Sequence, residues 1–138
     1  MSAVHVDHVG IIVADLDRAV ARLAVLFGGK PVLKELPEVG LRVAEFHAAN
    51  VTIELLQYTG ANDEFARGVM GERTGLNHLS ARVEDVDRSL RELRAAGLQP
   101  MEGFPRQGAH GRVAFFKPDD ASGLLFEICQ PEPQAKGD

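Results

Sequence analysis

The chain has 138 residues, with 15 Lys and Arg against 20 Asp and Glu, so its net charge is −5. This length suits one well-buried core, and the absence of a dense basic run argues against a nucleic-acid binder. The sequence lacks both a signal peptide pattern and an apolar run that could span a bilayer, so we expect a cytoplasmic protein without a membrane partner. Cys129 is the only cysteine, which leaves imidazole and carboxylate groups as candidate metal ligands.

The first half predicts a strand, a helix and three further strands. A β-rich stretch ends at Asp15, whose carboxylate can accept hydrogen bonds from the first turn of a helix. Apolar residues recur after it at helical spacing, at Ala19, Leu23 and Phe27. The Gly28-Gly29 pair is expected to end the helix. Short strand-like runs punctuated by Pro and Gly follow at 31–35, 41–48 and 51–57.

The second half predicts the same order. A helix begins near Asp85, has an apolar side of leucines and ends near Gly97. Strand-like runs follow at 99–103, 112–117 and 123–129. A linker over about 59–74 joins the halves and contains a short helix near 63–70, and the polar tail 131–138 is expected to be frayed.

Two ungapped matches identify the halves as copies of one unit. His8–Arg18 aligns with His78–Arg88, and the His, one Val, two Asp and the Arg coincide. Thr52–Gln57 aligns with Leu125–Gln130, and the Glu and Gln coincide. Such an internal repeat decides the architecture, so we predict an α+β fold of two tandem βαβββ modules. They would form one domain over 1–138, with modules at about 4–58 and 75–130.

One His and one Glu recur at equivalent positions of the repeat: His8 and Glu54, then His78 and Glu127. All four lie in apolar strands, where a lone buried carboxylate is costly unless a cation neutralises it. A pseudo-two-fold repeat brings one His and one Glu from each half toward its axis. This mixed nitrogen and oxygen set suits Zn²⁺, Co²⁺, Ni²⁺, Mn²⁺ or Fe²⁺. We therefore predict one divalent metal ion held by these four residues.

Each of the four residues taken alone also has an ordinary explanation. An isolated His is commonly a satisfied core residue, and an isolated Glu is commonly a polar position on an edge strand. Arg82 shares the predicted strand face of His78 and offers a carboxylate a basic partner. The joint occurrence of all four at repeat-related positions favours the metal site.

The chain resembles the vicinal oxygen chelate superfamily and, within it, the methylmalonyl-CoA epimerase family, in the segments VDHVGIIVADLDRAV, NVTIELLQ, GLNHLSARVEDVD, GAHGRVAFFKPDD and GLLFEICQ. The resemblance implies a cupped, barrel-like mixed sheet with helices outside, and a homodimer. It also implies that the metal ligands are His8, Glu54, His78 and Glu127, in agreement with the repeat. The implied activity is epimerisation of an acyl-CoA, in which the metal polarises a thioester carbonyl and stabilises the enolate.

Epimerisation requires proton transfer at both faces of one carbon, which two acid/base groups accomplish most simply. The resemblance implies that Glu127 is one of them, in addition to its role as a ligand. Val43 aligns where some family members have the second glutamate. Glu45 lies two residues further on the same strand face and is the candidate replacement, although it could be a solvated strand carboxylate.

The glycine-rich turn before the last strands suggests substrate contacts. Arg112 and Lys117 could bind a carboxylate or a CoA phosphate, or they could be ordinary basic loop residues. His110 in the same turn could close over the site or be exposed. Two residues depart from the family pattern: Asp119 ends a motif that usually reads His-Pro-Lys, and Asn77 replaces the first His of a frequent pair.

Three other functions use the same scaffold. A lactoylglutathione lyase of the glyoxalase I type would act on a glutathione hemithioacetal with the same metal set. A ligand-sequestering protein of the bleomycin-resistance kind would use the cleft without metal, but the complete ligand set argues against it. An extradiol dioxygenase typically uses two His and one carboxylate, which would leave Glu54 as a surplus anion.

Overall fold

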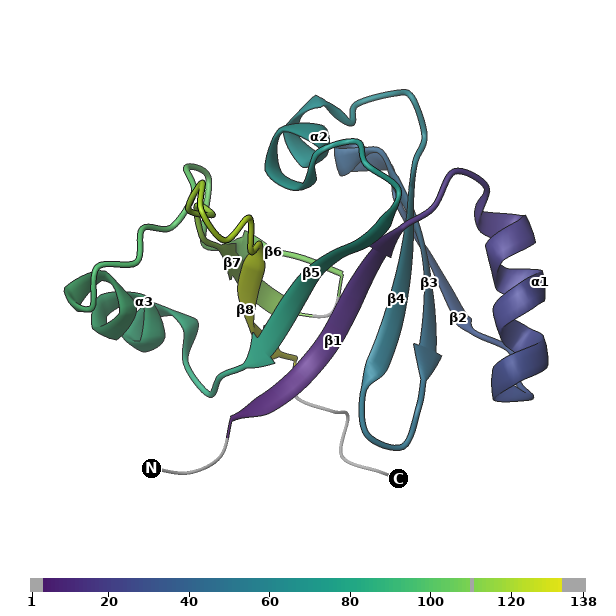
Figure 1. The fold of residues 1–138 in the computed structure, drawn as a ribbon, viewed down its shortest axis with the longest axis horizontal. Helices are drawn as coiled ribbons and strands as arrows, with labels where there is room; N and C mark the ends of the chain where they lie inside the picture. The colour runs from purple at the N-terminus through teal and green to yellow at the C-terminus, as the bar shows by residue number, and fades with distance from the viewer. Residues whose placement is uncertain (1–3, 110, 133–138) are drawn as a thin grey trace. The chain divides into compact units, whose positions relative to one another are not determined.

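The structure is a computed structural model that describes residues 4–109 and 111–132 (Figure 1). The chain divides into an N-terminal unit, Val6–Leu79, and a C-terminal unit, Ser80–Asp138 together with Met1–His5. Of the predicted features, His110 and residues 133–138 of the tail lie outside the described residues. Within the described ranges, every helix is too short or too polar to cross a membrane.

The N-terminal unit contains two helices and most of five strands. In chain order these are β1 (His5–Ile12), α1 (Leu16–Phe27), β2 (Val32–Leu36), a 3-10 turn (Pro37–Val39), β3 (Leu41–His47), β4 (Thr52–Tyr58), α2 (Glu64–Met70) and the start of β5 (Gly75–Arg82). The strand order is β2-β3-β4-β1-β5. β1 runs parallel to β4 and β3 runs antiparallel to it, so that Gly10 and Glu45 both lie opposite Glu54.

The C-terminal unit repeats this plan with shorter strands. After the end of β5 come α3 (Val86–Ala95), β6 (Arg106–Gln107), β7 (Gly111–Phe115) and β8 (Phe126–Pro131). The strand order is β5-β8-β7-β6, and Phe115 on β7 lies opposite Glu127 on β8. The predicted α+β class and the twofold βαβββ order are confirmed.

The predicted strand over 99–103 is wrong. Pro100 forms only an isolated bridge with Phe116, and the second strand of this unit is the short β6 further along the chain. Pro100 has no N–H to donate to a ladder, and Gly103 has a φ of +92°, which turns the chain. The apolar and Gly/Pro pattern therefore predicted that a strand follows α3, but it predicted the wrong residues for that strand.

The two long helices begin with the same pair of contacts. Asp15 and Asp85 are the N-caps, and each accepts a hydrogen bond from the N–H three residues on, at 3.1 and 3.2 Å. The side chains of Gln57 and Gln130 accept from the first N–H of α1 and α3, at 2.6 and 3.0 Å. The glutamine shared by the two repeat copies thus joins the last strand of each copy to its helix.

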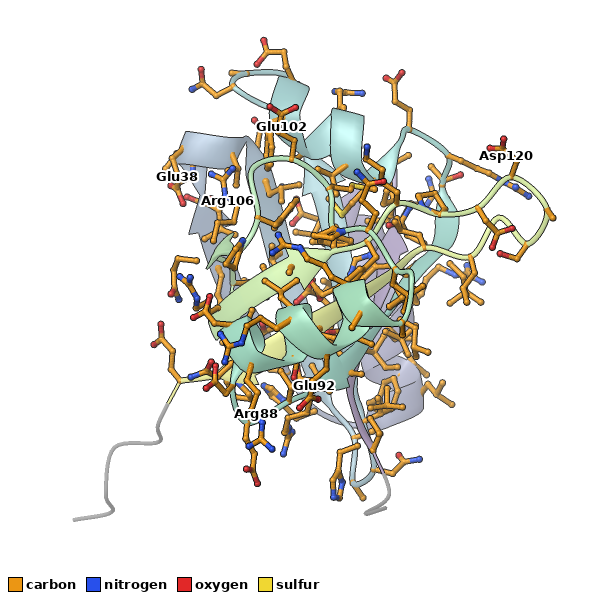
Figure 2. The ribbon with its side chains drawn as sticks, turned by 90° about the vertical axis from the view of Figure 1, so that its left-hand side faces the viewer. Glu38, Arg88, Glu92, Glu102, Arg106 and Asp120 are labelled. Carbon is orange, nitrogen blue, oxygen red and sulfur yellow. The ribbon has the colours of Figure 1, made fainter. Side chains whose placement is uncertain are left out.

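An equivalent ion pair joins helix and sheet in each unit. Asp17 on α1 lies 3.2 Å from Arg42 on β3, and Asp87 on α3 lies 3.2 Å from Arg112 on β7. In both units the two residues are 25 apart in the sequence. Figure 2 shows the solvent side of α3, where Arg88 and Glu92 form a further pair at 3.3 Å.

Each unit buries one face of its strands beneath its helix (Figure 1). The core under α1 contains Leu16, Ala44, Phe46 and Leu55, and the core under α3 contains Val86, Leu90, Ala114, Phe116 and Ile128. Successive side chains of a strand point to opposite faces. The neighbours Glu45, Glu54 and Glu127 therefore point away from the helices, which places these three carboxylates on the other face of their strands.

Tyr58, the only tyrosine of the chain, anchors the linker after β4. Its hydroxyl donates to the carbonyl oxygen of Gly71 at 2.5 Å, and the Arg67 guanidinium lies 4.4 Å from the ring centroid. Burial raises the pKa of Tyr58 to about 12. Arg67 also donates to the Asp63 carboxylate at 3.0 Å, which lowers the pKa of Asp63.

We expect the alkaline titration of the folded protein to show this shift directly, through tyrosinate absorbance. Because the folded pKa of Tyr58 lies above the unfolded value of 10.0, its contribution to stability is complete below pH 10 and is lost as the pH rises toward 12. The folded protein should therefore ionise near pH 12, and urea should return the midpoint to about 10. Circular dichroism at each pH establishes that the protein is folded, and a midpoint near 10 in folded protein would contradict the prediction.

Candidate metal centre

Three of the four predicted ligands come together in the N-terminal unit. His8 lies on β1, Glu54 on β4 and His78 on β5, and these are neighbouring strands in the order β4-β1-β5. The exposed fractions of the three residues are only 2%, 4% and 6%. Three neighbouring strands thus bury two imidazoles and one carboxylate together.

The geometry of these three groups is compact. His8 Nε2 lies 3.9 Å from Glu54 Oε1. The rings of His8 and His78 are edge-to-face, with centroids 5.6 Å apart and an interplanar angle of 87°. Two imidazoles and one carboxylate within this range are a nitrogen and oxygen donor set typical of zinc and of related first-row metals.

The other ring nitrogen of each histidine contacts the residue just before it. His8 Nδ1 lies 2.8 Å from Asp7 Oδ2, and His78 Nδ1 lies 2.8 Å from Asn77 Oδ1. Histidines that bind metals almost always donate their second nitrogen to such an acceptor, so the residues present fit a divalent metal ion. Sequence reasoning missed this role, although a signal existed: both acceptors directly precede a repeat-related histidine.

The absence of a side chain at Gly10 leaves room for the ring of His78. A Cβ atom at Gly10 would lie 2.2 Å from Cε1 and 2.5 Å from Nε2 of His78, closer than atoms can approach. The imidazole of His78 therefore lies directly against the backbone of β1, which only a glycine permits at this position.

Glu127, the fourth predicted ligand, lies in the C-terminal unit on β8. It is buried, with 4% exposure, and it points to the face opposite Phe126 and Ile128, which pack beneath α3. Its cross-strand neighbour is Phe115, whose ring packs 5.5 Å from that of Phe104. Glu127 thus lies opposite one aromatic residue within its unit, and its roles as ligand and base stay predictions.

Glu45 lies directly across from Glu54 in the β3–β4 hairpin and is 2% exposed. The ammonium of Lys34 lies 3.3 Å from its carboxylate, and Nε2 of His47 lies 3.7 Å from it. Lys34 offsets the cost of burying this charge. Val43, at the position of the expected second base, is instead fully buried in a cluster with Leu41, Leu56 and Ala66. Glu45 is therefore a buried carboxylate on the strand face that Val43 also uses, and its catalytic role stays a prediction.

The two predicted substrate-binding residues occupy different surroundings. Arg112 pairs with Asp87 on the α3 side of β7, the face that Ala114 also uses. Lys117 is exposed and its backbone N–H donates to Gln99. In the turn after it, hydrogen bonds from Ser122 lower the pKa of Asp119. Contact of either basic residue with a substrate stays a prediction.

Comparisons with known proteins identify the family of the chain and proteins with a similar fold. The sequence model of the Glyoxalase/Bleomycin resistance protein/Dioxygenase superfamily matches residues 7–116. The chain is 30% identical over 128 residues to the uncharacterized protein YqjC of Bacillus subtilis, with 91% of each chain covered.

Two solved structures are similar over almost the whole chain. The crystal structure of methylmalonyl-CoA epimerase from Mycobacterium tuberculosis is 30% identical, has a TM-score of 0.81, and covers 97% of this chain and 95% of its own. A methylmalonyl-CoA epimerase in complex with methylmalonyl-CoA and NH4+ is 26% identical, has a TM-score of 0.75, and covers 94% and 96%.

Proposed function

Because the chain belongs to the glyoxalase/bleomycin resistance protein/dioxygenase superfamily, we propose that it is a metal-dependent epimerase of an acyl-CoA such as methylmalonyl-CoA. The observation that carries the proposal is the buried cluster of His8, Glu54 and His78, whose donor groups suit a divalent metal ion. The similar structure in complex with methylmalonyl-CoA supports this choice of substrate class.

We assign the metal to His8, Glu54, His78 and Glu127, the set of residues that the repeat predicts. When bound, a divalent ion supplies a Lewis acid that polarises the thioester carbonyl and balances the charge that develops when the α-proton leaves. The burial of these side chains excludes water, which strengthens every electrostatic interaction with the substrate.

The chain itself supplies the proton transfers. In one direction the carboxylate of Glu127 takes the α-proton, and a protonated Glu45 delivers its own proton to the opposite face of the same carbon. The reverse direction exchanges the two roles, so no net proton is consumed. His47 is exposed and lies 3.7 Å from Glu45, so it offers a route by which this carboxylate takes up a proton from solvent.

Proton exchange with solvent tests the proposal. We expect purified protein loaded with Co²⁺ to bind about one ion per chain and to replace the α-hydrogen of methylmalonyl-CoA with deuterium in D₂O, followed by mass spectrometry. Treatment with a chelator should stop the exchange, and added metal should restore it. Metal-loaded protein that leaves the α-hydrogen in place would overturn the assignment.

One observation favours a second candidate, a glyoxalase I-type isomerase. The apolar cluster around Val43 leaves the usual second-base position without a carboxylate, and a single shuttling carboxylate suffices for isomerisation of a hemithioacetal. Supplying methylglyoxal with glutathione and recording thioester absorbance distinguishes the two. Thioester formation without exchange of the acyl-CoA proton would select the lyase.

A further inference from the structure

The ring nitrogens of the two candidate histidine ligands are distinguished by their neighbours. The Asp7 carboxylate lies 2.8 Å from His8 Nδ1, and an ionised carboxylate can only accept a hydrogen bond. His8 therefore carries a proton on Nδ1. Its Nε2, on the side of Glu54, is the nitrogen that can present a lone pair to a metal.

The amide of Asn77 imposes the same choice on His78 by a different route. Its Nδ2 donates to the carbonyl oxygen of Met70 at 2.7 Å, so the amide oxygen is the atom that faces His78 Nδ1 at 2.8 Å. An amide oxygen only accepts, so His78 also carries its proton on Nδ1. The carbonyl of Met70, at the end of α2, thereby fixes the orientation of the Asn77 side chain.

Gly10 determines where the second ring lies. The three ring atoms Cε1, Nε2 and Nδ1 of His78 lie within 2.2, 2.5 and 2.7 Å of the position that a Gly10 Cβ would occupy. The φ of Gly10 is not in the left-handed region, so an alanine there would meet steric conflict with the ring and no backbone strain.

We propose that Asp7 and Asn77 are positioning residues that hold both imidazoles with Nδ1 protonated and Nε2 directed to the metal, and that Gly10 provides the space for the His78 ring. The proposal rests on the metal binding of the proposed function and adds three residues to it. Asp7 and Asn77 are also equivalent in the repeat, but one is a carboxylate and the other an amide, so His8 has the stronger acceptor.

Nitrogen-15 NMR of the chelator-treated protein tests the positioning without metal. Both His8 and His78, assigned through His→Gln variants, should carry a hydrogen on Nδ1, because either a neutral Nδ1–H ring or a doubly protonated ring does so. A bare Nδ1 on either ring would overturn the proposal. In the Zn²⁺-loaded protein the metal-induced shift should fall on Nε2 of both rings.

Zn²⁺ affinity, measured by competition with a chromogenic chelator, tests the consequence. Asp7→Leu and Asn77→Leu, which both remove the acceptor, should each weaken binding by about 10- to 100-fold, the range typical of acceptors behind metal-bound histidines. Asp15→Asn is the matched control, since asparagine caps a helix as well as aspartate and the site is elsewhere. Affinities of both variants within twofold of wild type would contradict the inference.

Gly10→Ala should weaken Zn²⁺ binding at least as strongly, because the His78 ring has to move. Gly29→Ala is its control, since nothing lies within 4 Å of an added Cβ there. Equal affinities for the two alanine variants would overturn the role of Gly10. Wild-type protein with both Nδ1 atoms protonated but without Zn²⁺ uptake would instead overturn the proposed function.

Discussion

Glu127→Gln is expected to lower the rate of α-proton exchange of the epimer whose hydrogen faces Glu127 by about 10²- to 10⁴-fold, the usual contribution of a positioned general base. The amide keeps an oxygen for the metal but cannot accept the proton. Deuterium incorporation into methylmalonyl-CoA measures the rate, and metal content measured on the same sample separates loss of the base from loss of the ion.

Glu45→Gln should affect the other epimer, because in our proposal each of the two residues serves one face of the substrate. The variant should exchange the α-hydrogen of one epimer and stop the interconversion of the two. Glu35→Gln is the control, since Glu35 is an exposed carboxylate on β2. Full interconversion by Glu45→Gln would exclude Glu45 from catalysis, and undiminished exchange by Glu127→Gln would exclude Glu127.

Gly40→Ala is expected to have the largest effect on stability, with a loss of about 2–5 kcal/mol in the free energy of unfolding. Gly40 has a φ of +67°, and an added Cβ would lie 2.4 Å from the carbonyl oxygen of Ala61 and 2.6 Å from Cβ of Asp63. Backbone strain and steric overlap therefore act together, against a total stability of about 5–15 kcal/mol for a typical domain.

Gly28→Ala separates these two causes. Gly28 has a φ of +68°, nearly the same as that of Gly40, but nothing lies within 4 Å of an added Cβ. It should lose only the strain, about 1–2 kcal/mol. Urea denaturation monitored by circular dichroism measures both variants, and equal losses would show that the contacts around Gly40 relax at no cost.

The sequence predicted the strands and helices best where the repeat and the local signals agreed. Asp15 and Asp85 cap their helices as expected, because an N-cap depends on neighbouring residues alone. The strand predicted over 99–103 failed because pairing depends on a distant partner, and Pro100 forms only one bridge there.

The candidate site shows the same division between local and distant information. The repeat made His8, Glu54 and His78 visible, since it preserves the residue type at equivalent positions of the two copies. The contact between Gly10 and the His78 ring joins residues 68 positions apart, and nothing in the pattern indicated it. The pairing of Arg112 with Asp87 was also missed, although the pair Arg42 and Asp17 lies at the same separation in the first half.

The internal repeat preserves the attachment of each helix but not the neighbours of each glutamate. Glu54 has the carboxylate of Glu45 across the strand, whereas Glu127 has Phe115 at the corresponding position. Two identical copies of the unit would carry the same chemical groups beside each glutamate. Because the two cross-strand partners differ, one glutamate has an acidic neighbour and the other has an aromatic neighbour, although the backbone around them is duplicated.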